Sequence, residues 1–333
     1  MKSFLIVSIL SALSVCAFPQ SESSSSPQQP QTQPQPQQQQ PPSLVQPSGQ
    51  QEQQQAAPAQ QPNAPGPPPQ QEPEQQGPPS TGRKVQAKTK PEYDAYQAAD
   101  AVVTGDPDFA KGEAAAADFQ TKFPQSDLTS ILYDKLMKRY SQANNGPKTA
   151  EMGRKELALD PQSLPALLTV ASVVSQTAHP SDLDYKDRYQ EVLKDANQAL
   201  EELNNPATAP QGFAPDQLNS LKALAYAAIG NMEFVQAGEE NANPADRAQH
   251  DAAAEQALKQ STALNASNPD PGEWLRLAVT LDHQKKYAEA LDAANKAVQF
   301  AGSEPNVLTL AQQEQTRLKA LAPAPPANAP TPH

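Results

Sequence analysis

The sequence predicts an all-α protein: an α-solenoid of about five helix-turn-helix units with a capping helix, preceded by a disordered N-terminal region. Three observations support this fold class. Alanine is abundant and there are only 13 glycines in 333 residues, a balance that favours helix. Apolar residues recur at the spacings expected for one face of a helix. An aromatic residue and a later proline also recur 28 residues apart, at Tyr96 and Pro124 and again at Tyr133 and Pro161.

The first two predicted units occupy the beginning of the folded part. The first has two apolar helix faces on either side of the turn Gly105–Pro107, marked by Tyr96, Ala99, Val103, Phe119 and Phe123. The second begins with the stripe Tyr133, Leu136 and Tyr140 and breaks at Asn144–Pro147. Glycine and proline interrupt helices, so each break is expected to separate the two helices of a unit.

The third and fourth units are less regular, and the sequence leaves their register open. The third has a first helix marked by Leu167, Val170, Ala171 and Val174, and a second helix that starts late, after His179-Pro180. Apolar positions on that second helix are Tyr189, Val192, Ala196, Ala199 and Leu200. The fourth unit is predicted to open with Leu221, Leu224 and Ala225, to turn at Gly230-Asn231 and to resume beyond an insertion at Ala253, Ala257 and Leu264.

The fifth unit carries the clearest marker of the series. Leu277, Ala278, Ala290 and Ala297 follow Trp274 at offsets of 3, 4, 16 and 23 residues. This is the spacing of the tetratricopeptide repeat (TPR), a helix-turn-helix unit of roughly 34 residues. Residues 91–321 therefore resemble the TPR family, and the chain as a whole resembles exported bacterial TPR proteins with a Gln/Pro-rich N-terminal spacer. A final helix over 306–321, rich in Gln and charged residues, is predicted to cap the exposed end.

The resemblance implies a right-handed superhelix whose inner, concave surface, lined mostly by first helices, binds a protein or peptide partner. One subset of the family clamps a terminal carboxylate with Lys and Asn at the fifth and ninth positions of the repeat. Here the fifth positions carry Gln97, Asp134 and Leu168, and the ninth carry Ala101, Lys138 and Ser172. That ligand class is therefore not predicted.

Five polar residues on the expected inner face are the candidate binding residues. They are Asp134, Lys138, Arg276, Asp282 and His283. For each of them, the sequence favours a plain solvated side chain over a contact residue. Trp274 is predicted to belong to the core, with ligand contact as its alternative.

Both ends of the chain are predicted to lie outside the helical domain. Residues 1–17 have the basic start, the apolar stretch and the small residues before a cleavage site that are typical of a secretory signal peptide. Residues 18–90 form a Gln/Pro-rich spacer without apolar periodicity, which predicts disorder. Residues 322–333 form a Pro/Ala tail. The protein is thus expected to be exported to the periplasm, the cell surface or the medium.

Two features near the N-terminus leave other roles open. Cys16 is the only cysteine, and its lipidation would make the protein an anchored structural or assembly component of the envelope. The basic residues Arg83, Lys84, Lys88 and Lys90 at the end of the spacer raise the alternative of a module that binds the cell wall.

The sequence predicts neither an enzyme nor a cofactor or metal site. The four histidines lack the spacing of metal ligands, and no phosphate-binding loop, GxSxG or HExxH motif is present. Asp182, Asp184 and Asp187 are predicted to form an acidic helix start rather than a calcium site. A net charge of −12 argues against nucleic acid and against broad adsorption to anionic membranes.

The resulting hypothesis is a non-catalytic exported scaffold with a protein or peptide partner. No nucleic-acid partner is expected, and no transmembrane span is expected once the signal has been removed. The sequence leaves the oligomeric state open.

Overall fold

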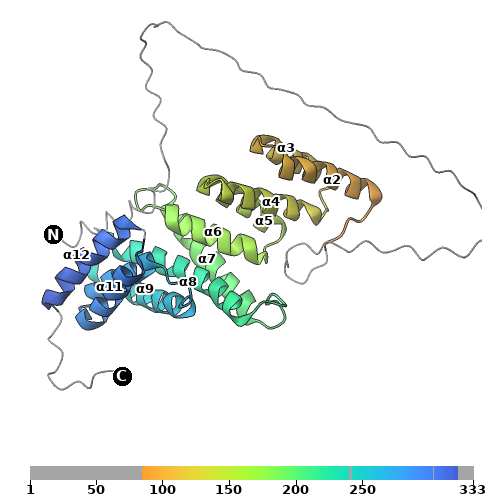
Figure 1. The fold of residues 1–333 in the computed structure, drawn as a ribbon. Helices are drawn as coiled ribbons and strands as arrows, with labels where there is room; N and C mark the ends of the chain where they lie inside the picture. Colours follow the sequence, from red (N-terminus) through yellow and green to blue (C-terminus); the bar gives the residue numbers. More distant parts are fainter. Residues whose placement is uncertain (1–84, 240–241, 303, 322–333) are drawn as a thin grey trace, which may run out of the picture. The chain divides into compact units, whose positions relative to one another are not determined.

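A computed structural model of the chain describes residues 85–239, 242–302 and 304–321 (Figure 1). Within these ranges the chain forms eleven helices and no strand, so the predicted all-α class is confirmed. The helices pack mainly against their neighbours in sequence. The predicted signal peptide, almost all of the predicted spacer and the predicted tail lie outside the described residues.

The first two helix pairs share one hydrophobic core. Helix α2 (Lys90–Gly105) pairs with α3 (Phe109–Lys122), and α4 (Leu128–Gln142) pairs with α5 (Gly146–Leu159). Fully buried side chains of this core include Val103, Phe119, Leu132, Leu136, Met137 and Met152. The apolar stripes predicted from the sequence therefore face inward on both pairs.

The remaining helices share a second, larger core. They are α6 (Leu164–Thr177), α7 (Tyr185–Asn204), α8 (Pro215–Ala237), α9 (Pro244–Leu264), α10 (Pro271–His283), α11 (Tyr287–Phe300) and α12 (Pro305–Leu321). Large buried side chains in this core include Leu167, Met232, Phe234, Leu258, Leu275 and Leu281. Helix α12 packs against α11 and α10, at the place expected for a capping helix, and Figure 1 shows it beside α11.

Short polar side chains begin most of these helices. Each accepts a hydrogen bond from a backbone N–H of the first turn, which would otherwise have no partner inside the helix. These N-cap residues are Thr89, Asp108, Asn145, Ser163, Asn243 and Asp270. Local sequence therefore fixes where these helices begin.

The turns of the second and fifth pairs share an unusual backbone conformation. Asn144 (φ 54°) and Lys285 (φ 61°) are the non-glycine residues with positive φ in the described part of the chain. Each lies 11 residues after the marker of its unit, Tyr133 or Trp274. A left-handed conformation costs roughly 1–2 kcal/mol for most residues. Its presence at equivalent positions indicates that the two pairs turn in the same way.

The turn predicted at Gly230-Asn231 is wrong, because both residues lie inside the 23-residue helix α8. Gly230 lets α8 approach α9 closely: a Cβ atom built there would lie 2.8 Å from Leu258 Cγ. The buried side-chain amide of Asn231 donates a hydrogen bond to the backbone carbonyl of Ser175 on α6. A pair of residues that is typical of a turn thus serves helix packing here.

Candidate functional site

A groove of about 680 Å³ lies between α9, α10 and α11. Its apolar lining includes Ala263, Ala266, Trp274, Leu277, Leu281 and Ala288. Its charged lining consists of Lys259, Glu289, Asp292 and Lys296. A concave, mainly apolar surface with a few polar groups at its edge is the usual form of a binding site.

Trp274 lies at the boundary between this groove and the core. Its ring is partly buried, packs against the larger core and lines the groove. The Nζ of Lys296 lies 4.4 Å from the ring centroid, within the range of a cation–π interaction. The ring centroid of Phe300 lies 6.5 Å away. Trp274 therefore has the core role predicted for it and also presents part of its surface to the groove.

The charged edge of the groove is balanced by its own ion pairs. Lys259 Nζ lies 2.8 Å from Glu289 Oε2, and Lys296 Nζ lies 3.0 Å from Asp292 Oδ2. Lys259 also contacts Glu255, at 2.8 Å. The Lys259–Glu289 and Lys296–Asp292 pairs are exposed, and such pairs contribute roughly 0–1 kcal/mol each, so Glu289 and Asp292 can exchange partners at little cost. The edge thus suits an uncharged ligand with polar backbone groups.

Glu255, beside this edge, is held firmly as a carboxylate. Burial would raise its pKa, but hydrogen bonds from Lys259 and Lys286 outweigh that effect and lower the pKa to about 2. Lys286 Nζ lies 2.6 Å from Glu255 Oε2. This contact ties the start of α11 to α9.

Asp134 and Lys138, two of the predicted binding residues, lie together on α4 and do not line the groove. They form an ion pair with 2.7 Å between Lys138 Nζ and Asp134 Oδ2. The other carboxylate oxygen of Asp134 is buried without a hydrogen-bond partner, as is Oε2 of Glu156 on α5. Burial, and to a lesser degree the charge of Asp134, raises the pKa of Glu156 to about 8. Asp134 thus faces another helix as well as its own lysine.

Asp282 and His283, at the end of α10, contact neighbouring helices. Asp282 Oδ2 lies 2.5 Å from Arg317 Nη2 of α12, and only 9% of the Asp282 side chain is exposed. His283 Nδ1 lies 3.0 Å from Asp251 Oδ1 of α9. Neither residue lines the groove. These contacts join α10 to the helices beside it, and a role in partner binding stays a prediction.

Arg276, the remaining predicted binding residue, lies one turn after Glu273 near the start of α10 and is also absent from the groove lining. Burial lowers the pKa of Arg276, while the charges of Asp270 and Glu273 favour its protonated form. Ser261 Oγ donates a hydrogen bond of 2.6 Å to Glu273. Burial raises the pKa of Glu273 to about 7, an effect that this hydrogen bond partly offsets.

A second contact between a histidine and a carboxylate joins α8 to α9. His250 Nδ1 lies 2.6 Å from Glu233 Oε2, and the Tyr189 hydroxyl of α7 donates a hydrogen bond of 2.8 Å to Glu233 Oε1. Together with the contact between His283 and Asp251, it forms a row of polar links from α7 to α10. Each of these carboxylates has a partner on a neighbouring helix, which is the arrangement expected of structural contacts.

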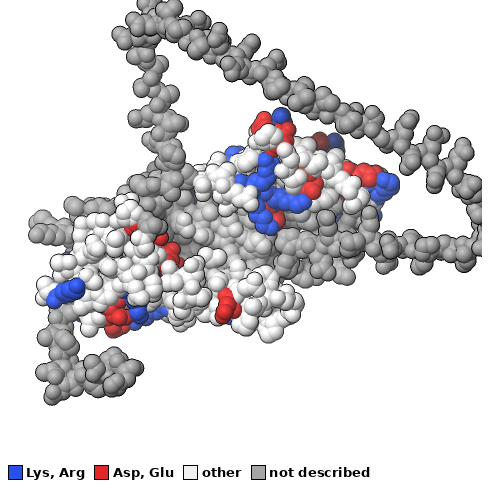
Figure 2. Space-filling model, in the orientation of Figure 1, with Lys and Arg blue, Asp and Glu red and all other residues white. Residues whose placement is uncertain are grey.

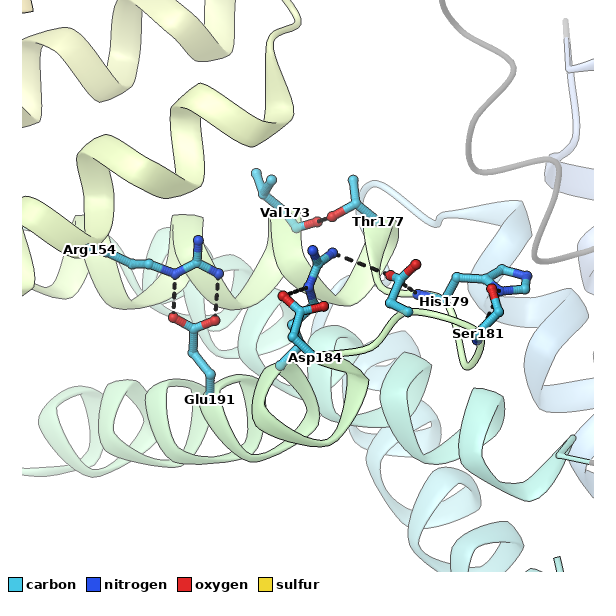
Figure 3. A network of polar contacts seen from close by, with 9 residues as sticks. Arg154, Val173, Thr177, His179, Ser181, Asp184 and Glu191 are labelled. Carbon is cyan, nitrogen blue, oxygen red and sulfur yellow. Dashed lines mark hydrogen bonds and ion pairs between the residues drawn. The ribbon is translucent and has the colours of Figure 1, made fainter. Parts of the chain in front are cut away.

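The acidic turn predicted before α7 is held by basic and backbone groups; its Asp184 and the preceding His179 are labelled in Figure 3. Arg188 Nε lies 2.9 Å from Asp184 Oδ2, and Arg188 Nη1 lies 3.4 Å from Asp182 Oδ2. The backbone N–H of His179 donates a hydrogen bond of 2.9 Å to the same Asp182 oxygen. Across the described ranges, no group of three or more His, Cys, Asp or Glu residues is arranged to hold a metal ion.

On the face drawn in Figure 2, acidic and basic side chains lie close to one another, and wide uncharged areas separate these groups. Among the helices of the described ranges, none is both long and apolar enough to cross a membrane.

No protein-family model matches this chain, and no curated protein matches its sequence. The candidate site therefore rests on the geometry of the groove and on the chemistry of the residues around it.

Sequence reasoning placed the site on first helices and did not identify the groove between the second helices α9 and α11. The sequence carries only a weak indication of this groove. Ala263, Ala266 and Ala288 are exposed apolar residues close to charged ones, but an alanine in a helix has the same sequence pattern whether it is buried or exposed. They come together only because α9 and α11 both line the groove with α10.

Proposed function

We propose that this protein is a non-catalytic helical scaffold that binds an extended segment of a partner protein in the groove between α9, α10 and α11. One observation carries the proposal: an open groove has the partly buried Trp274 on an alanine-rich floor. An extended segment can place small apolar side chains on that floor. Its backbone N–H and C=O groups would then face the charged edge.

The helix pairs are proposed to be TPR-like repeats. Three small residues at the marker positions of the fifth unit, Ala278, Ala290 and Ala297, are each 0% exposed. Small residues at such positions let paired helices approach each other closely. The shared left-handed turn residues, Asn144 and Lys285, also support a common repeat geometry.

Export is part of the same proposal. The predicted signal peptide over residues 1–17 supports it, and the predicted spacer over residues 18–90 would give the scaffold reach from whatever surface or assembly it joins. A lipid anchor at Cys16 stays the alternative to a free exported protein.

The proposal is tested by selecting peptides that bind the full chain from a phage-displayed library of random dodecapeptides. Selected peptides are then titrated by calorimetry against the native chain, an Ala263→Arg variant and an Ala252→Arg control. Ala263 is exposed on α9 and lines the groove, whereas Ala252 is exposed on the same helix and does not line it. Arginine at 263 fills part of the groove without entering the core.

We expect Ala263→Arg to weaken binding by about 1–3 kcal/mol, as for loss of an interface anchor, and Ala252→Arg to leave the affinity unchanged. Equal affinity for both variants would place the peptide elsewhere. Failure to enrich any peptide would also count against the groove as a peptide site.

A further inference from the structure

We infer that the groove is occupied in the free protein by the chain's own Pro/Ala segment, residues 322–333, which competes there with the partner segment. This inference rests on the proposed function, because it requires that the groove accept an extended peptide. It adds an intramolecular competitor to that site.

The segment begins beside the groove. Helix α12 ends at Leu321, and four residues earlier Arg317 contacts Asp282, the second-last residue of α10. Helix α11 starts at Tyr287, and its next two residues, Ala288 and Glu289, line the groove. The segment thus leaves α12 near the end of the groove that is formed by the start of α11.

The length of the segment is sufficient for this path. Twelve residues in a polyproline II conformation span ~37 Å at about 3.1 Å per residue. The groove-lining part of α11, from Ala288 to Lys296, is only ~12 Å long at 1.5 Å per residue. The segment can therefore pass around the turn between α10 and α11 and still run along the groove.

The composition of the segment suits the groove in size and in charge. It carries no Asp, Glu, Lys or Arg, which matches an edge whose charges already neutralise one another. Polyproline II repeats every three residues, so Pro323, Pro326, Ala329 and Pro332 share one face in that conformation. Small, rigid apolar groups on one face fit an alanine-lined floor beside an indole ring.

Proline-rich segments commonly bind grooves lined by aromatic side chains, because their preformed conformation loses little entropy on binding. Covalent attachment adds a high effective concentration, on the order of millimolar for a short connection. The short connection to α12 therefore favours residues 322–333 as the occupant over the proline-rich part of the N-terminal region, which joins the helical domain at α2.

The test uses the fluorescence of Trp274, the only tryptophan of the chain. Quenching by acrylamide is measured for the full native chain, for a Pro323→Ser, Pro326→Ser variant and for a Pro325→Ser, Pro330→Ser control. All of these substitutions lie beyond the last helix, and circular dichroism checks that the helix content is unchanged. The control removes the same number of prolines from the other faces of the segment.

We expect the quenching constant of the Pro323→Ser, Pro326→Ser variant to rise roughly twofold as the groove empties, and that of the control to match the native chain. The same variant should bind a library-selected peptide about threefold more tightly, because the fraction of open groove increases. Equal quenching in all three proteins would overturn the inference. So would an equal rise in both variants, or a protection of Trp274 that grows with protein concentration and so comes from a second copy.

These outcomes separate the inference from the proposed function. If quenching is equal in all three proteins while a selected peptide still loses affinity on Ala263→Arg, only the intramolecular occupant is excluded. If no selected peptide depends on Ala263, the proposed function fails as well.

Discussion

The free energy of unfolding is expected to fall as the pH is raised from about 5 to about 8, because Glu156 is buried in its neutral form. Its side chain accepts a hydrogen bond from Ser163, and only 5% of the residue is exposed. Burial raises its pKa to about 8 from an ordinary value of 4.5. The group is therefore protonated in the folded protein and ionised in the unfolded chain over this range.

The direction of this pH dependence follows from proton binding at Glu156. Between pH 4.5 and 8 the folded state binds more protons at Glu156 than the unfolded state, so each increase in pH favours unfolding. The full contribution is present below pH 4.5 and is lost above pH 8. For one such group the loss approaches ~1.4 kcal/mol per pH unit. Glu273 and Asp195, whose pKa values burial raises to about 7 and about 6, act in the same direction.

Replacing Glu156 by Gln isolates this effect. The amide keeps the shape of the side chain and an oxygen that can accept the Ser163 hydrogen bond, but it does not titrate. At pH 8 the Glu156→Gln variant is expected to be more stable than the native chain by roughly 2–4 kcal/mol, and near pH 5 the two should be similar. Denaturant unfolding at several pH values measures both curves.

Glu151→Gln is the matched control. Glu151 lies on the same helix, its side chain is 43% exposed, and contacts with Lys155 and Lys148 lower its pKa. The Glu151→Gln substitution should leave the change in the free energy of unfolding between pH 5 and 8 the same as in the native chain. A native protein whose stability stays level over this range, or a Glu156→Gln variant with the native slope, would show that Glu156 ionises freely in the fold.

Gly230→Ala is expected to destabilise the protein by about 1–3 kcal/mol, the range for an overpacked core site. Alanine usually stabilises a helix interior relative to glycine by roughly 0.5–1 kcal/mol. At this site, however, the new Cβ would lie 2.8 and 2.9 Å from Leu258 side-chain carbons and 3.2 Å from its backbone nitrogen. Leu258 is 0% exposed, and its backbone nitrogen is among the close atoms, so we expect α8 and α9 to be pushed apart.

Gly105→Ala provides the comparison. Gly105 is the last residue of α2, and a Cβ there would have nothing within 4 Å. Thermal unfolding should show no loss of stability for Gly105→Ala and a clear loss for Gly230→Ala. An equal gain in stability in both variants would mean that α8 and α9 are not in close contact at Gly230.

Much of the fold could be predicted from local sequence. The apolar stripes at Tyr133 and Trp274 identified helix pairs, and breaks such as Asn144–Pro147 separated their helices. The caps Ser163 and Asp270, which fix where α6 and α10 begin, were not among the predicted features. Gly230 was misassigned because a glycine that permits close helix packing and a glycine that ends a helix look alike in one sequence. The difference depends on Leu258, which belongs to another helix.

The candidate site could be predicted only in part. Trp274 was predicted to belong to the core, with ligand contact as the alternative; its exposed surface depends on how α9, α10 and α11 are arranged, which local patterns do not encode. Asp282 and His283 were candidate binding residues of the expected inner face, but Arg317 and Asp251 contact them from neighbouring helices. In the same way, the sequence does not distinguish Glu156 from an exposed glutamate on a helix. Its burial and its hydrogen bond from Ser163 depend on how α6 packs against α5.

The indole N–H signal of Trp274 in an ¹H–¹⁵N NMR spectrum reports on peptide binding in the groove, because Trp274 lines the groove and is the only tryptophan of the chain. A peptide selected on the full chain is added stepwise, and the shift of this one signal is compared with the affinity from calorimetry. We expect a saturable shift with the same Kd, and in the Ala263→Arg variant a shift that requires roughly 5- to 150-fold more peptide, as its weaker binding implies. A bound peptide that leaves the indole signal in place would contradict binding in the groove between α9, α10 and α11.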